Sequence, residues 1–262
     1  NGKMIEKHEF KGKNDGLSLL VLAAVHGNET AGTQACRRII DEIERGALAL
    51  KNGKMTLVPV CNPEAYRRDV RNIDENLNRV MTVHDNPRSY EQKLANEICP
   101  LIREHRFTLD LHSTHCVGDV PFAFCDYPDV YNQKLIDALP VDFVLEGWPD
   151  IYGRQTEIRD FSTEWCAHAY GNTATTLECG YHRDPQAAGL AYRAIVNALS
   201  AFGMVDLPLP AARAKKHIRM ENYVLKSKEG RLCRSYKHLD PVCKGERIAL
   251  YDDGEALYAL SD

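Results

Sequence analysis

The amino-acid sequence predicts an α/β protein that ends in a small β-rich unit. Apolar runs of strand length alternate with segments of helical period over most of the chain. The first of these runs, Leu19–Val25, has no polar face, which is typical of a strand that is buried on both sides of a sheet. Beyond the stretch 206–213, which contains two prolines, short strand-like segments replace this alternation.

The first half of the α/β region alternates regularly. Leu19–Val25 is apolar throughout and is expected to be a buried strand, and Met55–Cys61 is expected to be a second one. Between them, Thr30–Leu48 carries isoleucines at helical spacing and is predicted to be a helix that ends near Gly46. Ser89–Glu104 is predicted to be a helix that opens with a capping box, because its serine is followed three residues later by a glutamine.

The second half continues the pattern. Phe107–Leu111 is predicted to be the third strand, and Phe143–Leu145 a further short one. Phe161–Tyr170 is predicted to be helical, whereas Thr173–Cys179 is rich in β-branched residues and reads as a strand. Asp184 followed by a proline has the pattern of an N-cap with proline at the first helical position, so a helix is expected to run to about residue 202.

The prolines at 208 and 210 mark a linker, because proline interrupts regular structure. We therefore divide the chain into an α/β domain, residues 1–205, and a β-rich unit, residues 206–262. Four short strands are expected in the second unit: His217–Leu225, Arg231–Ser235, Arg247–Tyr251 and Ala256–Leu260.

Composition narrows the classes of function. The chain has 262 residues, a formal net charge of −4 and no basic block, so nothing in its charge favours a nucleic-acid partner. Its nine cysteines form no C-x-x-C pair, which points to reduced thiols in a cytosolic enzyme. The longest apolar stretch, residues 17–25, is too short to span a bilayer, and no signal peptide is visible. We expect a cytoplasmic protein that has no membrane partner.

The first chemically informative motif is His26-Gly27-Asn28-Glu29, directly after the first strand. Residues three apart in the first turn of a helix share one face, so His26 and Glu29 can reach a single ion. Gly27 permits a tight turn off the strand. Imidazole and carboxylate together suit zinc. Taken alone, such a pair more often marks a structural histidine.

Two further polar positions lie at the ends of predicted strands. His112 ends the third strand, and Asp110 points to the same face as a candidate partner for its ring. Glu178 lies near the end of the strand Thr173–Cys179, where an unpartnered carboxylate is costly unless it has a chemical task such as that of a general base. Because sites in α/β sheets gather beyond the carboxyl ends of strands, these residues are expected to meet His26.

A fourth group of candidates, Arg71, Asn78 and Arg79, lies between these strands. A guanidinium beside an amide suits a substrate carboxylate, and Arg71 is suited to donate to a developing oxyanion. A solvated, charged loop is the competing interpretation of this stretch when it is considered alone.

In combination, the four segments VHGNETAG, NPEAYRRDVRNIDENLNR, DLHS and TLECGYHRDP closely resemble the succinylglutamate desuccinylase/aspartoacylase family. The resemblance covers about residues 18–203. It implies the zinc carboxypeptidase-like fold, a three-layer α/β/α sandwich with a mixed sheet, followed by a β-rich C-terminal unit.

The resemblance also implies roles for individual residues. His26, Glu29 and His112 match the ligands of one Zn²⁺ ion per chain, and Glu178 matches the general base that activates a zinc-bound water. Three protein ligands leave the fourth position open, as in catalytic rather than structural sites.

The remaining matches concern the substrate. Arg71 matches the arginine that polarises the scissile carbonyl, and Asn78 with Arg79 matches the pair that grips the substrate α-carboxylate. One departure stands out: where the family usually has a second acidic residue in this segment, the chain has Asn76.

The function that these matches imply is zinc-dependent amide hydrolysis, with removal of the acyl group from an N-acyl amino acid, a small-molecule carboxylate. A zinc carboxypeptidase acting on short peptides and a non-catalytic ligand-binding relative are the alternatives. The acyl group is left open; His182, Arg183, Arg154 and Arg159 are candidates for contacting it. A homo-oligomer is compatible with the sequence, which does not fix the oligomeric state.

Overall fold

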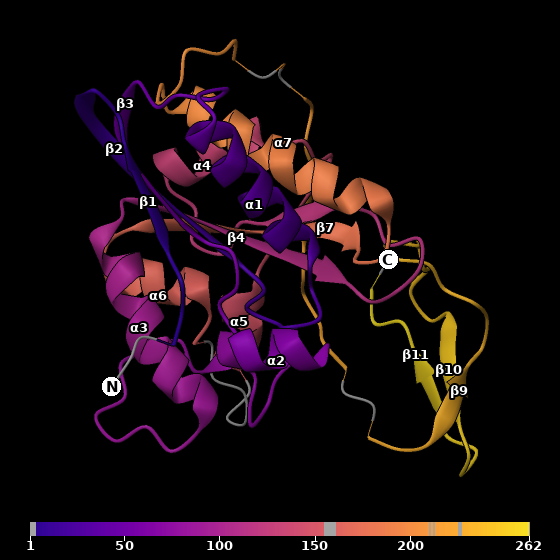
Figure 1. The fold of residues 1–262 in the computed structure, drawn as a ribbon. Helices are drawn as coiled ribbons and strands as arrows, with labels where there is room; N and C mark the ends of the chain where they lie inside the picture. Colours follow the sequence, from indigo (N-terminus) through magenta and orange to yellow (C-terminus); the bar gives the residue numbers. More distant parts are fainter. Residues whose placement is uncertain (1–3, 155–160, 210, 212, 225–226, 262) are drawn as a thin grey trace.

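The computed structural model describes residues 4–154, 161–209, 211, 213–224 and 227–261. Arg159 lies outside the described residues. The chain forms a three-layer α/β/α structure and a small antiparallel sheet near its C-terminal end, as the sequence analysis predicts (Figure 1).

The central layer is a mixed sheet of eight strands in the order β1-β3-β2-β4-β7-β5-β6-β8. Most neighbouring strands are parallel, whereas β1 with β3 and β5 with β7 are antiparallel. The strands are β1 (His8–Lys11), β2 (Asn14–Ala23), β3 (Asn52–Val58), β4 (Phe107–Thr114), β5 (Phe122–Phe124), β6 (Phe143–Glu146), β7 (Thr173–Tyr181) and β8 (Lys216–Arg219).

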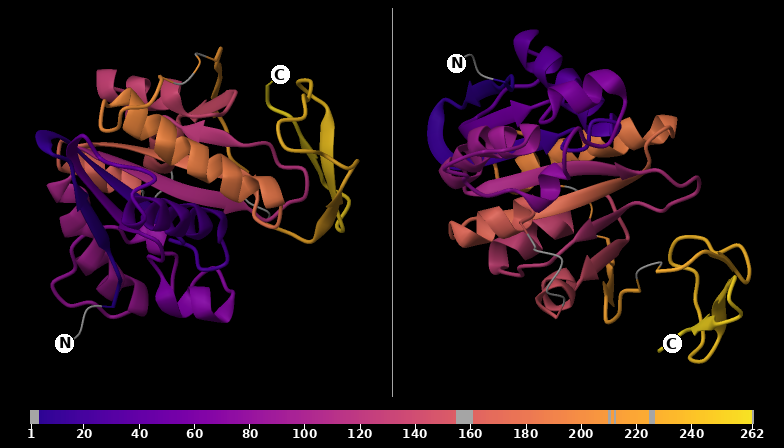
Figure 2. Two further views of the ribbon diagram at one scale, coloured as in Figure 1. Left: turned by 45° about the horizontal axis from the view of Figure 1, so that its top comes forward. Right: turned by 90° about the horizontal axis from the view of Figure 1, so that it is seen from below.

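Helices cover both faces of this sheet, so the central strands are buried on both sides (Figures 1 and 2). On β2, Leu19 and Val21 pack under α1, α4 and α7, whereas Leu20 and Leu22 pack under α3 and α6. The helices are α1 (Ala31–Glu44), α2 (Pro63–Arg68), α3 (Tyr90–Glu104), α4 (Val130–Ala138), α5 (Trp148–Gly153), α6 (Thr163–Ala169) and α7 (Pro185–Ala201). In the part of the chain that the structure describes, none of the helices is long and apolar enough to cross a membrane.

The predicted strands and helices of the α/β domain are present, with ends shifted by a few residues. Sequence analysis missed β1, β5, α2, α4 and α5. β1 lies at the sheet edge and is rich in charged residues, so it lacks an apolar run. β5 has only three residues, too few to show a period.

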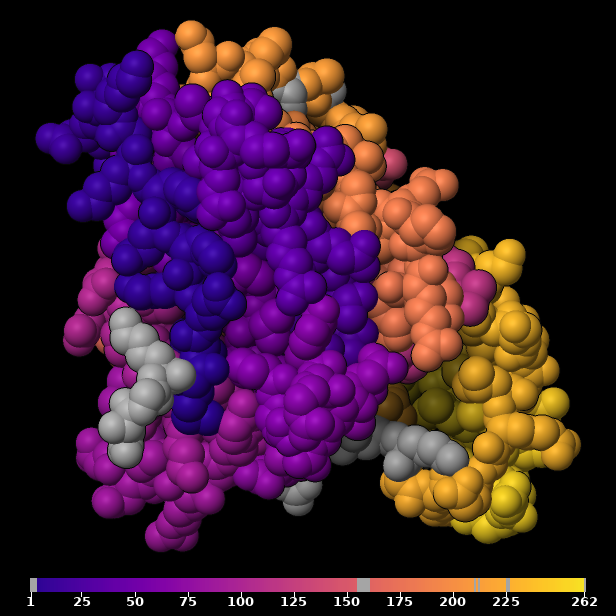
Figure 3. All heavy atoms as spheres, in the orientation of Figure 1, coloured from indigo at the N-terminus to yellow at the C-terminus, as the bar shows by residue number. Residues whose placement is uncertain are grey.

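The C-terminal sheet consists of β9 (Gly230–Leu232), β10 (Arg247–Tyr251) and β11 (Ala256–Tyr258), which lie at one side of the molecule (Figure 3). The segment predicted as the first strand of this unit behaves differently: β8 pairs in parallel with β6 and completes the edge of the large sheet. Its partner is distant in sequence, and no local pattern indicates such a pairing. The division of the chain at residue 206 stays a prediction.

Candidate active site

The predicted site residues from different segments meet beyond the carboxyl ends of three adjacent parallel strands, β2, β4 and β7. His26 follows β2, His112 lies near the carboxyl end of β4, and Glu178 lies near the carboxyl end of β7. The register pairs His112 directly with Glu178, so the two side chains project from the same face of the sheet.

The turn that carries His26 and Glu29 depends on Gly27. A Cβ atom on Gly27 would lie 2.1 Å from the backbone carbon of Ala65 in α2, far inside van der Waals contact. The Gly27 N–H donates to the carbonyl of Arg71, at 3.1 Å, and the Glu29 N–H donates to the carbonyl of His26, also at 3.1 Å. Only a glycine lets the turn lie this close to α2.

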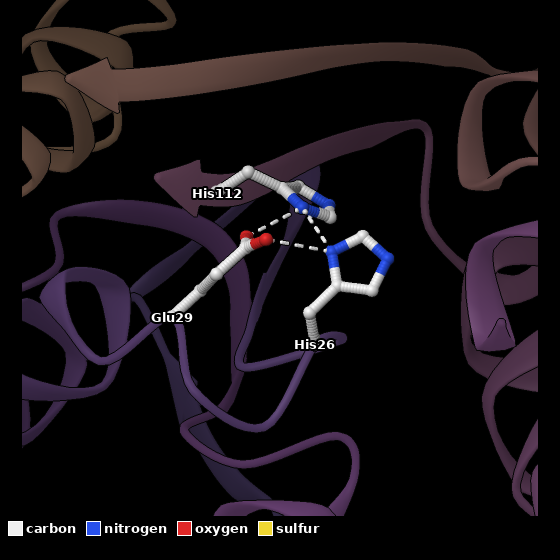
Figure 4. A group of neighbouring side chains, drawn as sticks. All are labelled: His26, Glu29 and His112. Atoms are coloured by element: carbon white, nitrogen blue, oxygen red, sulfur yellow. Dashed lines mark hydrogen bonds and ion pairs between the residues drawn. The ribbon is translucent and has the colours of Figure 1, made fainter. Parts of the chain in front are cut away.

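The side chains of His26, Glu29 and His112 converge in a buried cluster (Figure 4). Both ring Nδ1 atoms lie 2.9 Å from a carboxylate oxygen of Glu29, and the two Nδ1 atoms are 3.2 Å apart. A tetrahedral ion with Zn–N bonds of about 2.0–2.1 Å holds its ligand atoms about 3.3 Å apart. The donor atoms and their spacing therefore fit a zinc-type ion.

Hydrogen bonds on the far side of each ring fix the histidine tautomers. The Nε2–H of His112 donates to Asp110 Oδ2 at 2.9 Å, and the Nε2–H of His26 donates to Asn76 Oδ1 at 2.9 Å. In its neutral form, each ring then presents the lone pair of Nδ1 to the cluster, as a metal ligand requires. The hydroxyl of Thr163 also donates to Asp110 Oδ2, at 2.6 Å. Asn76, the departure from the family pattern, thus contacts a candidate ligand directly.

The charges of the cluster are strongly coupled. Burial lowers the pKa of His112, but Asp110 and Glu29 outweigh it, and the pKa lies well above its usual value. Burial likewise opposes ionisation of Glu29, yet the two histidines bring its pKa well below the usual range. Glu29 also accepts hydrogen bonds from Arg71 Nη1, at 3.0 Å, and from the Ser113 backbone, at 3.1 Å. An ionised carboxylate is the form that binds a cation.

Glu178 is partly buried beside this cluster, and its buried Oε2 atom has no hydrogen-bond partner among the residues that the structure describes. Burial, and then the charge of Glu29, raises the pKa of Glu178 to about 8. A carboxyl group tuned in this way is matched to proton transfer near neutral pH.

The loop that carries Arg71 is held by Glu91, a residue that sequence analysis did not single out. Glu91 is fully buried on α3, and its carboxylate accepts hydrogen bonds from the Asn62 side chain and from three consecutive backbone N–H groups, those of residues 73–75. A glutamate in the first turn of a predicted helix reads as an ordinary surface residue, so no sequence signal indicated this role.

Asn78 and Arg79 lie on a short 3₁₀ turn, Leu77–Arg79. Asn78 Oδ1 accepts from the Thr163 backbone at 2.9 Å, and Arg79 Nη2 donates to the Tyr152 hydroxyl at 2.5 Å. Both residues line the same cavity as His26, His112, Arg71 and Glu178. The structure thus brings these six residues to one cavity, whereas Glu29 lies behind its wall.

The cavity has a volume of about 210 Å³. Its other lining residues, which sequence analysis missed, are Phe124, Asp126, Trp148, Tyr152, Ser162, Glu164 and Thr176. Among the described residues, neither the C-terminal unit nor His182, Arg183 or Arg154 contributes to the lining. Several missed residues come from β5 and α5, the short elements that the sequence pattern did not reveal.

Comparison with known proteins gives a family match. The model of the succinylglutamate desuccinylase/aspartoacylase catalytic domain matches residues 15–186, about two thirds of the chain. This range includes every candidate site residue named above.

Two individual relatives carry the name of the same family. The succinylglutamate desuccinylase of Pseudomonas fluorescens Pf-5 is 35% identical over 95 residues, which are 36% of this chain and 28% of that protein. The enzyme of the same name from Vibrio vulnificus YJ016 is 26% identical over 171 residues, 62% of this chain and 49% of the relative. The matches therefore span at most half the length of these two relatives.

A solved structure shares the fold. The succinylglutamate desuccinylase of Silicibacter sp. TM1040 superposes with a TM-score of 0.77 over 99% of this chain and 82% of its own, at 19% identity.

Proposed function

Because the chain belongs to the succinylglutamate desuccinylase/aspartoacylase family, we propose that it is a zinc-dependent hydrolase that removes the acyl group from an N-acyl amino acid. The observation that carries the proposal is the cluster of His26, Glu29 and His112, whose two histidines line one cavity together with Glu178. A cavity of about 210 Å³ suits an amino acid with a short acyl group better than an extended peptide.

The three residues His26, Glu29 and His112 would hold one zinc ion per chain. Their two nitrogens and one carboxylate are the donor set of catalytic zinc sites, which keep a further position open. When bound, such an ion polarises a carbonyl group and lowers the pKa of water. Asp110 and Asn76 orient the two rings toward it.

Glu178 acts as the general base. Its unpartnered Oε2 takes the proton of the attacking water and passes it to the leaving amine when the amide bond breaks. Arg71, whose side chain is half exposed and lines the cavity, donates to the carbonyl oxygen as negative charge develops there.

Asn78 and Arg79 bind the α-carboxylate of the substrate. The arginine is held against the Tyr152 hydroxyl and the Asn78 carbonyl, so its guanidinium is oriented before the substrate arrives. A guanidinium and an amide side by side match the two oxygens of a carboxylate.

The proposal is tested by measuring release of free amine from N-acetyl, N-formyl and N-succinyl amino acids and from short peptides. Each reaction is run with the zinc-loaded protein, after removal of metal by a chelator, and after zinc is returned. We expect release from at least one acyl amino acid that the chelator abolishes and zinc restores. Release from peptides alone would contradict the proposal, as would release that is indifferent to the chelator.

A further inference from the structure

Thr163 is a buried residue at the start of α6 that contacts two different parts of the candidate active site. Its hydroxyl donates to Asp110 Oδ2 at 2.6 Å, and its backbone N–H donates to Asn78 Oδ1 at 2.9 Å. Asp110 holds the ring of His112, a candidate metal ligand, whereas Asn78 is a candidate for binding the substrate carboxylate. One residue therefore connects the metal site with the carboxylate-binding site.

The hydroxyl of Thr163 matters because Asp110 has few other partners. Asp110 is fully buried, and in the described part of the chain its carboxylate accepts hydrogen bonds only from Thr163 and from His112, both on Oδ2. A carboxylate that was held only by the ring it orients would be free to move together with that ring. The hydroxyl supplies the second attachment, so the ring of His112 meets a fixed acceptor.

The backbone N–H of Thr163 determines which end of the Asn78 amide is available to a ligand. The amide oxygen already accepts from this N–H, and no described residue accepts from the Nδ2 group. A carboxylate only accepts hydrogen bonds, so the amide must offer Nδ2 in order to bind it. The contact with Thr163 therefore orients Asn78, which lines the cavity, for this task.

The residues on both sides of Thr163 are themselves attached. The hydroxyl of Ser162 caps α6 by accepting from the Trp165 N–H at 3.1 Å. On the other side, Glu164 Oε1 accepts from the Thr176 N–H of β7 at 2.7 Å. Thr163 is therefore held in place before metal or substrate binds, as a residue that orients others must be.

The other candidate metal ligand, His26, has a similar connection. Asn76 Oδ1 accepts from His26 Nε2 and from the Asn78 backbone N–H, both at 2.9 Å. The backbone of Asn78 is thus attached on the side of His26, and its side chain is attached through Thr163 on the side of His112. Without Thr163, the connection on the second side would be lost.

We propose that Thr163 is a positioning residue for both halves of the site. Its hydroxyl fixes Asp110, and through Asp110 the His112 ring, for metal binding. Its backbone N–H fixes the Asn78 amide for the α-carboxylate. The inference rests on the proposed function for the roles of His112 and Asn78.

Three substitutions separate the two hydrogen bonds of Thr163. Thr163→Val removes the hydroxyl and keeps the N–H, whereas Thr163→Ser keeps both. Thr163→Pro removes both donors, and proline is well accepted at the first position of a helix. The preceding Ser162 is extended, with φ −81° and ψ 172°, a conformation that suits the residue before a proline.

Zinc affinity, measured by competition with a chromophoric chelator, tests the role of the hydroxyl. We expect Thr163→Val and Thr163→Pro to bind zinc about tenfold more weakly than the unchanged protein, and Thr163→Ser to bind it almost as tightly. The matched control is Thr56→Val. Thr56 is also fully buried, and its hydroxyl is hydrogen-bonded to His105, which precedes β4 and so lies at the other end of the sheet from the site. This control should keep the zinc affinity.

Binding of N-acetylglycine tests the role of the N–H. Titration calorimetry is carried out at saturating zinc on chains that also carry Glu178→Gln, so that turnover does not interfere. N-acetylglycine has an α-carboxylate and no side chain, so its binding does not depend on a side-chain pocket. We expect Thr163→Val and Thr163→Ser to bind it like the parent chain, and Thr163→Pro about fivefold more weakly.

Unchanged zinc affinity in Thr163→Val would overturn the role of the hydroxyl, as would an equal loss in Thr163→Ser or Thr56→Val. Equal binding of N-acetylglycine by Thr163→Pro and Thr163→Val would overturn the role of the N–H, as would a parent chain that does not bind it.

Hydrolysis of N-acetyl, N-formyl and N-succinyl amino acids is measured separately on the protein without substitutions. The expected zinc and N-acetylglycine results, in a protein that hydrolyses none of these compounds, would support the positioning role of Thr163 and contradict the proposed function. Hydrolysis combined with unchanged zinc and N-acetylglycine binding in all Thr163 variants would do the reverse.

Discussion

His112 and Glu178 are register partners on adjacent parallel strands, β4 and β7. One is a candidate metal ligand and the other the candidate base, and the sheet sets their separation at the spacing of neighbouring strands, about 4.8 Å between backbones. Their relative position is therefore fixed by backbone hydrogen bonds and does not depend on a loop, which is the arrangement that precise proton transfer requires.

Replacing Glu178 by glutamine removes the base and preserves its shape. We expect kcat to fall by about 10²–10⁴-fold, with zinc content unchanged, because the glutamate is not among the proposed ligands. Steady-state kinetics and metal analysis of the purified variant check this, with the exposed Glu104→Gln as control. Turnover within threefold of the unchanged protein would remove Glu178 from the mechanism.

The pH dependence of kcat/KM should report the ionisation of Glu178. Because the base must be ionised and burial raises its pKa to about 8, activity should fall as the pH drops below the pKa. A bound divalent cation favours the carboxylate, so the midpoint should lie between 4.5 and 8 in the loaded enzyme. A profile that is flat from pH 5 to 9 would contradict this assignment.

Asp110 positions the ring of His112 and does not touch the proposed ion. Asp110→Asn should therefore weaken zinc binding by about 10–100-fold and should leave the fold intact. Competition with a chromophoric chelator measures the affinity, and Asp137→Asn on the exposed face of α4 is the matched control. Equal affinity of both variants would show that this hydrogen bond does not tune the site.

Gly27→Ala tests the close approach of the metal-binding turn to α2. The added methyl would lie 2.1 Å from the Ala65 backbone, so the turn must shift; we expect a loss of about 2–3 kcal/mol in the free energy of unfolding and weaker zinc binding. In α7, Gly189→Ala meets only the end of the Arg193 side chain, at 3.6 Å, and should stabilise by up to about 1 kcal/mol. Urea titration compares the two, and equal effects would refute the steric argument.

Glu91→Gln leaves one oxygen where two now accept four hydrogen bonds. The loop that carries Arg71 should loosen, and we expect kcat/KM to fall more than zinc affinity does, with a loss of stability of about 2–4 kcal/mol. Kinetics, metal titration and denaturation of the same preparation separate these effects. Loss of zinc affinity in proportion to activity would show that Glu91 acts on the metal site instead.

The sequence predicted the layers and much of the site for a physical reason. Continuous apolar runs such as Leu19–Val25 have only one stable location, the middle of a covered sheet, and polar residues at the ends of such runs must then meet at one edge. His26, His112 and Glu178 follow this rule, and the structure places them together.

Asp126 and Glu164 also line the cavity, but they do not lie at the ends of long apolar strands, so the same reasoning could not place them there. Asp126 and Glu164 lie after a three-residue strand and within a short helix, where an acidic residue ordinarily faces solvent. Both positions depend on β7: Glu164 accepts a hydrogen bond from the Thr176 N–H of that strand, and Asp126 follows β5, which pairs antiparallel with β7 although the two segments are about fifty residues apart. Local sequence patterns contain no information on these contacts, which is why the two acidic residues of the cavity wall went unnoticed.

The pairing of β8 with β6 determines where the large sheet stops. Without residues 216–219, β6 would present a row of unpaired N–H and C=O groups to the solvent, and an open edge of this kind recruits strands from other molecules. β8 becomes the edge strand in its place, and it is short and carries Lys216, His217 and Arg219, which are features that discourage pairing with a strand of another molecule. During synthesis, this protection is absent until residues 216–219 have been made, so β6 is an open edge for as long as the growing chain stops short of β8.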